Sequence, residues 1–145
     1  MSGKVSSRDV TIWSEGSRLK AEFFAPAGGP NNSPAVLLCH GWGGLKSHLA
    51  TYAERFAAEG FACLVFDYRG WGDSDGKIIP QDNTPMLTEA GSMTIPVRVV
   101  REVVDPVDHV ADVRACLAWL LTEPGVDAGR VGLWGTSYGG GHVTF

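Results

Sequence analysis

The stretch Gly132-Leu-Trp-Gly-Thr-Ser-Tyr-Gly-Gly140 decides the fold of this 145-residue chain. Residues 130–134 predict a short buried strand, and the glycines after Ser137 predict the start of a helix. A serine on a sharp bend between strand and helix is lifted above the sheet, and such a bend needs glycine because side chains would clash. We therefore expect Gly135 and Gly139 to flank the bend and Ser137 to act as a nucleophile.

Upstream of this stretch, predicted strands and helices alternate. Continuous apolar runs at 35–39 and 61–66 predict strands that are buried on both faces. A helix that Ser47 caps and Gly60 ends lies between them, and a second helix follows the N-cap Asp105. This alternation predicts a mostly parallel sheet with right-handed crossovers.

The N-terminal part predicts an antiparallel addition to that sheet. Segments 9–14 and 18–25 read as strands, and the turn residues 15–17 between them predict a hairpin. The expected fold class is therefore α/β, with a mostly parallel sheet, an antiparallel N-terminal hairpin and flanking helices, all in one domain over residues 1–145. Residues 77–104 hold three prolines and few helix signals, so they form either a surface excursion or a cap over the site.

Composition and charge limit the class of protein. The chain is 44% hydrophobic and 19% charged, as is usual for a globular domain, and its net charge of −4 argues against nucleic acid as a partner. No apolar run approaches the roughly 20 residues that span a bilayer, so we expect no membrane segment. No secretory signal precedes the first strand, and the cysteines predict buried free thiols in a cytoplasmic protein. These are Cys39, Cys63 and Cys116.

A second glycine-rich stretch, His40-Gly-Trp-Gly-Gly44, follows the predicted strand 35–39. Gly41 and Gly43 allow the backbone to approach a ligand closely. The backbone N–H of Trp42, with that of Gly43 as the alternative, is expected to stabilise an oxyanion together with the N–H of Tyr138. His40 is interpreted as a residue that holds this turn by hydrogen bonds, not as the catalytic base.

These two stretches, together with Asp67-Tyr-Arg-Gly-Trp-Gly-Asp-Ser-Asp-Gly76, resemble the α/β-hydrolase superfamily. The chain looks most like its dienelactone-hydrolase-like esterases and its X-Pro dipeptidyl-peptidase-like serine hydrolases. The resemblance covers about residues 10–145 and implies the N-terminal half of one such domain. It implies that Ser137 is the nucleophile, that Trp42 and Tyr138 supply the oxyanion donors, and that Asp67 and Arg69 form a structural turn beside the site.

The rest of a catalytic triad is not evident. In this superfamily the acid and the histidine follow the serine along the chain, yet only eight residues follow Ser137. Among them His142 is poorly placed to act as the base, and His48 and His109 are interpreted as solvated helix residues. The strand at 130–134 would also be an open apolar edge. We therefore expect a second polypeptide segment, from the same precursor or another chain, to complete the sheet and supply an acid and a histidine.

The expected activity is hydrolysis of ester or related acyl bonds in a small molecule, through an acyl-enzyme on Ser137, without a metal or an organic cofactor. Without the second segment we expect no activity. Trp71 either contacts the substrate or packs in the core, while Arg98 and Arg101 either bind an acidic substrate group or are surface charges. A serine peptidase of the same fold is the alternative within the enzymes, and an inactive binding or assembly module is the alternative outside them.

Overall fold

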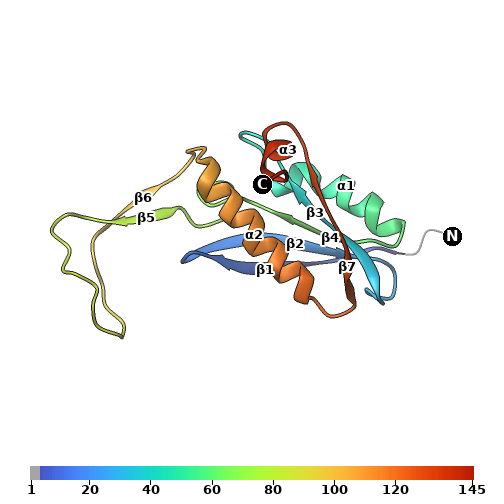
Figure 1. The fold of residues 1–145 in the computed structure, drawn as a ribbon, viewed down its shortest axis with the longest axis horizontal. Helices are drawn as coiled ribbons and strands as arrows, with labels where there is room; N and C mark the ends of the chain where they lie inside the picture. Colours follow the sequence, from blue (N-terminus) through green and yellow to red (C-terminus); the bar gives the residue numbers. More distant parts are fainter. Residues whose placement is uncertain (1–3) are drawn as a thin grey trace.

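The computed structural model describes residues 4–145, which form a five-stranded sheet, flanking helices and a projecting two-stranded ribbon (Figure 1). The elements in chain order are β1 (Ser6–Ser14), β2 (Ser17–Ala25), β3 (Ser33–Cys39), α1 (Lys46–Ala58), β4 (Ala62–Phe66), β5 (Lys77–Pro80), β6 (Val97–Val100), α2 (Pro106–Thr122), β7 (Val126–Gly135) and α3 (Tyr138–His142).

The main sheet has the strand order β1-β2-β4-β3-β7. β1 and β2 form the antiparallel hairpin, in which Val10 lies opposite Ala21, and β2 also runs antiparallel to β4. β3 runs parallel to both β4 and β7, so the C-terminal ends of these three strands lie at the same end of the sheet. The predicted α/β class with an antiparallel N-terminal hairpin is confirmed.

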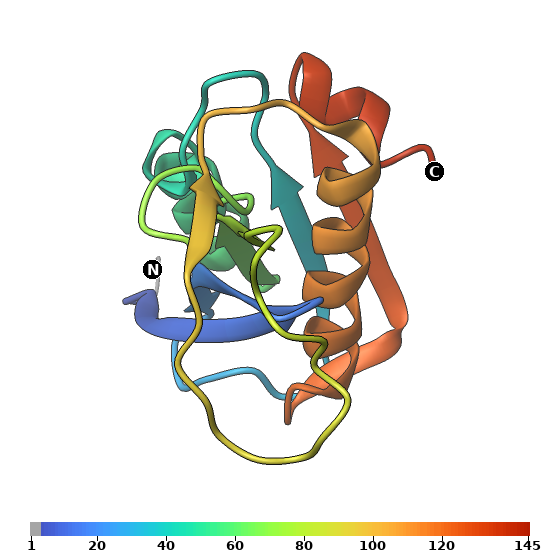
Figure 2. The same cartoon turned by 90° about the vertical axis from the view of Figure 1, so that its left-hand side faces the viewer.

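Helices cover both faces of the sheet because the central strands carry apolar side chains on both sides. Leu37 and Leu64 pack in one core cluster with Val113, Cys116 and Leu120 of α2. The alternate strand residues face the other way and pack in a second cluster with α1. All five residues of β4 are buried, as the continuous apolar run predicts. In Figure 2, α2 runs along one side of β3.

The two long helices begin in different ways. Asp105 caps α2 as predicted, because its carboxylate accepts the backbone N–H groups of Val107 and Asp108 at 2.9 and 3.3 Å. The prediction that Ser47 caps α1 is wrong, since this helix already begins at Lys46. The backbone N–H of Lys46 donates to Asp67 Oδ1 at 2.7 Å, so a distant carboxylate provides the capping acceptor.

Residues 77–104 form a surface excursion with two short strands of its own. β5 and β6 pair antiparallel, and nearly all the residues between them are exposed. In both views the tip of this ribbon lies away from α3 (Figures 1 and 2). Within residues 4–145, no helix is both long and apolar enough to cross a bilayer.

Candidate active site

Ser137 lies on the bend between β7 and α3, in a backbone conformation that residues other than glycine rarely adopt. Its φ and ψ are +52° and −122°, and its side chain is exposed. A Cβ on Gly135 would lie 2.3 Å from the carbonyl oxygen of Gly139, and a Cβ on Gly139 would lie 2.4 Å from those of Cys39 and His40. Both positions therefore require glycine, and the tight packing around them holds the strained serine in place.

The glycine turn at 40–44 lies directly against this bend. A Cβ on Gly41 would be 3.1 Å from the Cβ of Ser137 and 3.6 Å from its Oγ. The exposed ring of Trp42 lies 5.9 Å from that of Tyr138, measured between centroids. In the described part of the chain, the backbone N–H groups of Trp42 and Tyr138 donate to no acceptor. Two unsatisfied donors thus lie on the segments that meet at Ser137.

His40 holds the glycine turn from beneath. It is buried, and its Nδ1 lies 2.9 Å from the carbonyl oxygen of Gly41. Burial lowers the pKa of His40, so the ring is neutral and Nδ1 donates to that carbonyl. A Cβ on Gly44 would lie 2.9 Å from Nδ1, which shows how closely the turn wraps the ring. No hydrogen bond joins His40 to Ser137 in residues 4–145.

Asp67 ties the loop after β4 to the beginning of α1. Its buried carboxylate accepts the backbone N–H and the Nζ of Lys46, at 2.7 and 2.9 Å, and the backbone N–H of Asp73 at 3.1 Å. A Cβ on Gly72 would lie 2.3 Å from its Oδ2. The loop after β4 and the helix α1, which follows β3, are therefore fixed to each other.

Arg69 anchors the same loop on the opposite face of the sheet. Its backbone N–H donates to Asp112 Oδ2 at 2.8 Å, and its guanidinium donates to Oδ1 of the same residue at 2.7 and 2.9 Å. Both side chains are buried, and a further guanidinium N–H reaches Ser14 Oγ at 3.0 Å. Arg69 also lies 3.0 Å from Glu15 and 3.5 Å from Asp108, so loss of Arg69 would leave Asp112 as an uncompensated buried charge, whereas loss of Asp112 would leave Arg69 with two weaker partners.

The three candidates for substrate contacts each have contacts within the described residues. Arg101 donates to the carbonyl oxygens of Gly72 and Ser74, both at 2.8 Å, and thereby supports the loop after β4. Trp71 is half-buried against the core, with its Nε1 3.4 Å from the carbonyl oxygen of Val103. Arg98 lines a cavity of about 260 Å³ beside Arg69 and His109. Among the described residues, no hydrogen bond joins these three to Ser137 or to the turn at 40–44.

The interpretation of His109 as a solvated residue is wrong. It is 3% exposed, its ring stacks on Tyr68 with 4.4 Å between centroids, and neither ring nitrogen has a partner within residues 4–145. Burial, and then the nearby His142 and His40, lower its pKa to about 4. The spacing 109, 113, 116, 120 along α2 would have placed it on the buried stripe.

His142 is buried beneath the serine bend and does not face Ser137 as a base would. Its Nδ1 lies 3.0 Å from the hydroxyl oxygen of Tyr68. His48, in contrast, is exposed at the beginning of α1, where its Nδ1 accepts the backbone N–H of Leu45 at 3.2 Å. The sequence patterns do not single out Tyr68, although its ring packs against those of His40, His109 and His142.

The three cysteines are free and buried, as predicted. Burial raises the pKa of Cys39 and Cys63 to about 12 and that of Cys116 well above its ordinary value. A protonated buried thiol is a poor nucleophile. The three buried cysteines are therefore poor candidates for a nucleophile, whereas Ser137 is exposed.

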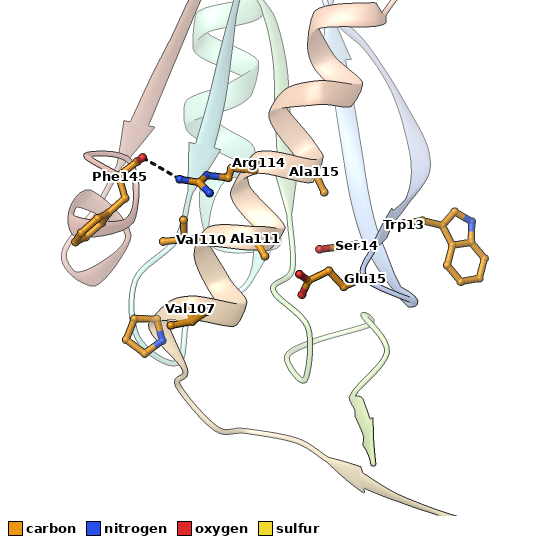
Figure 3. Close-up of a pocket in the computed structure, with 10 residues that line it drawn as sticks. Trp13, Ser14, Glu15, Val107, Val110, Ala111, Arg114, Ala115 and Phe145 are labelled. Carbon is orange, nitrogen blue, oxygen red and sulfur yellow. Dashed lines mark hydrogen bonds between the residues drawn. The ribbon is translucent and has the colours of Figure 1, made fainter. Parts of the chain in front are cut away.

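Other features of residues 4–145 do not form part of this site. Figure 3 shows a cavity of about 620 Å³ between α2 and the turn of the first hairpin, with Val107, Val110, Arg114 and Phe145 around it. None of its lining residues belongs to the serine bend or to the glycine turn. In the same residues, no three His, Cys, Asp or Glu side chains gather in a way that would hold a metal ion.

The parallel strands β4, β3 and β7, with a serine bend after one and a glycine turn after another, define a protein with the α/β-hydrolase fold. The dienelactone hydrolase-like promiscuous phosphotriesterase P91, from metagenomic libraries, shares it with a TM-score of 0.69 at 22% identity, over 98% of this chain and 53% of that one. Residues 15–145 match the X-Pro dipeptidyl-peptidase (S15) family, and the chain belongs to this family. The resemblance seen in the sequence is confirmed.

Two relatives carry names that state an activity. The quorum-quenching protein AidA of Acinetobacter baumannii is 38% identical over 112 residues, which are 77% of this chain and 30% of AidA. The thiohydrolase aneE of Aspergillus aculeatus is 29% identical over 113 residues, 77% of this chain and 29% of that protein. The chain thus spans less than a third of the length of these relatives.

Proposed function

We propose that this chain carries the nucleophile and the oxyanion donors of a serine hydrolase that cleaves ester or related acyl bonds. One observation carries the proposal: Ser137 is exposed on a strained bend, and the turn at 40–44 packs so closely that a Cβ on Gly41 would lie 3.1 Å from the Cβ of Ser137. Unpaired backbone N–H groups on both sides of this contact support a role for Trp42 and Tyr138 as donors. An inactive binding module would not need this strained conformation, so the intact bend favours an enzyme.

In the proposed reaction, Ser137 Oγ attacks the carbonyl carbon of the substrate and its proton passes to a histidine base. The carbonyl oxygen becomes an oxyanion, which the N–H groups of Trp42 and Tyr138 stabilise; loss of one such donor typically costs about 10²–10³ in rate. The intermediate then collapses to an acyl-enzyme, and the base returns the proton to the leaving alcohol, thiol or amine. Water, activated by the same base, releases the acid.

We propose further that another polypeptide segment supplies the base and its acid partner. In the described residues, His40 holds Gly41 and His142 holds Tyr68, while His109 is buried against Tyr68 with no hydrogen bond to Ser137. Within residues 4–145, β7 pairs only with β3, and Leu133 on this edge strand is 38% exposed. An apolar edge strand of this kind needs cover. A segment that adds a strand beside β7 would satisfy the edge and bring the triad residues to the same end of the sheet.

The kind of acyl bond is a separate question. The match to the S15 family favours a peptide bond after proline as the second candidate, whereas the relatives include a thiohydrolase. The exposed ring of Trp42, which lies beside the half-buried Tyr138, favours an apolar acyl group, because the ring would bury against it. We propose an ester or thioester as the preferred substrate, and a cytoplasmic location that keeps the buried thiols reduced.

A fluorophosphonate probe tests the proposal, with the protein assembled with the segment that completes the sheet. Covalent labelling that maps to Ser137 and is abolished by Ser137→Ala is expected. Hydrolysis rates for a p-nitrophenyl ester, an aryl thioester and an X-Pro anilide are then measured on protein that the probe labels. These rates show which kind of bond the protein prefers. Absence of labelling in any assembly would support the inactive module, and a preference for the anilide would support the peptidase.

A further inference from the structure

Tyr68 lies at the centre of a buried cluster that connects the two segments meeting at Ser137. It is 1% exposed, and its ring centroid lies 4.7 Å from that of His40 and 5.2 Å from that of His142, both edge to face. His40 begins the glycine turn, and His142 ends α3, the helix that follows Ser137 directly. One side chain therefore contacts both segments from below.

The hydroxyl of Tyr68 adds a directional contact to this packing. Its oxygen lies 3.0 Å from Nδ1 of His142. Burial raises the pKa of Tyr68 and lowers that of His142, so both side chains are neutral. Whichever tautomer the imidazole adopts, one proton joins these two atoms in a buried hydrogen bond, which is costly to lose.

The helix α3 has few other means of attachment. Three of its five residues are glycines, which have no side chain to pack. In the described part of the chain, the bond from His142 to Tyr68 is the only side-chain hydrogen bond that α3 makes. Gly139 packs closely against the end of β3, and the bond from His142 to Tyr68 fixes the other end of α3, so both contribute to the position of the Tyr138 N–H relative to the glycine turn.

We infer that Tyr68 is a positioning residue for the reaction at Ser137, because its hydroxyl holds α3 through His142 while its ring supports His40 under the glycine turn. This inference rests on the proposed function. Tyr68 would not touch the substrate. It would set the separation between the two oxyanion donors, and so act on the transition state more than on substrate binding.

Tyr68→Phe tests the inference, since it removes the hydroxyl and keeps the ring. Because a 1 Å misplacement of catalytic groups can cost about 100-fold, we expect kcat for an ester to fall by about 10- to 100-fold while KM changes by less than about threefold. Tyr52→Phe is the matched control: Tyr52 is half exposed, its ring lies against Trp134, and the same atom is removed. It should leave kcat and KM unchanged.

A double-mutant cycle separates positioning from general support of the fold. If the hydrogen bond carries the effect, Tyr68→Phe combined with His142→Leu should be no slower than the slower single variant. His142→Asn, whose amide can replace Nδ1, should retain more activity than His142→Leu, and this comparison stands even if Tyr68→Phe does not fold. Additive losses, or a wild-type kcat in Tyr68→Phe, would overturn the inference.

The rate of fluorophosphonate labelling distinguishes this failure from failure of the proposed function. If the assembled wild-type protein labels at Ser137 and Tyr68→Phe labels at the same rate, the positioning role alone is wrong. If the wild-type protein does not label, the proposed function fails, and the role of Tyr68 in it fails as well.

Discussion

Replacement of Gly139 by alanine should show whether close packing against the end of β3 sets the position of the serine bend. The new Cβ would lie 2.4 Å from the carbonyl oxygens of both Cys39 and His40. These are backbone atoms at the end of β3, so the contact is relieved only if α3 and the serine bend move away by roughly 1 Å, and overpacking of this kind costs about 1–3 kcal/mol. Because a displacement of this size can cost about 100-fold in rate, labelling of Ser137 should slow by about that factor.

Gly141→Ala is the matched control in the same helix. A Cβ at Gly141 meets nothing within 4 Å, and alanine is a better helix former than glycine. We expect its labelling rate to stay within about twofold of wild type and its thermal midpoint to be unchanged or slightly higher. The assay is the second-order rate of fluorophosphonate labelling, with the thermal midpoint measured in parallel. If Gly139→Ala labels as fast as Gly141→Ala, the close packing of the bend against β3 does not position the serine.

Three further predictions concern the support around the site. Asp112→Leu should lower the free energy of unfolding by about 2–3 kcal/mol, because Arg69 loses its buried partner and keeps Glu15 and Asp108, at 3.0 and 3.5 Å, and the double variant with Arg69→Met should lose less; urea denaturation measures both. Stability should fall as the pH falls from about 6.5 towards 4, by up to about 1.4 kcal/mol per unit, because the unfolded chain binds a proton that buried His109 does not; His109→Phe should flatten this slope in thermal scans, and an unchanged slope would contradict the assignment. Arg101→Met should lower the thermal midpoint by a few degrees through loss of two carbonyl contacts without changing KM, whereas a large rise in KM would instead indicate contact with the substrate.

Local sequence patterns predict those parts of the fold that depend on near neighbours in the chain. The hairpin of β1 and β2, the Asp105 cap of α2 and the glycine-flanked bend at Ser137 each follow from a few adjacent residues. The same holds for the burial of β3 and β4, since a continuous apolar run leaves no polar face for solvent.

The parts that sequence reasoning missed depend on residues far apart in the chain. Asp67 caps α1 in place of Ser47 because the loop after β4 returns to the beginning of that helix. The role of Tyr68 is evident only in the folded chain, where residues 40, 109 and 142 pack around its ring. His109 is missed for a different reason: apolar residues alone predict the buried face of α2, although a histidine at the same spacing is buried just as well.

The most direct test of the central claim is a crystal structure of the assembled protein after reaction with a fluorophosphonate. We expect phosphorus bonded to Ser137 Oγ, with one phosphonyl oxygen about 2.7–3.1 Å from the backbone nitrogens of both Trp42 and Tyr138. An adduct on another residue, or a phosphonyl oxygen that points into solvent away from both nitrogens, would contradict it.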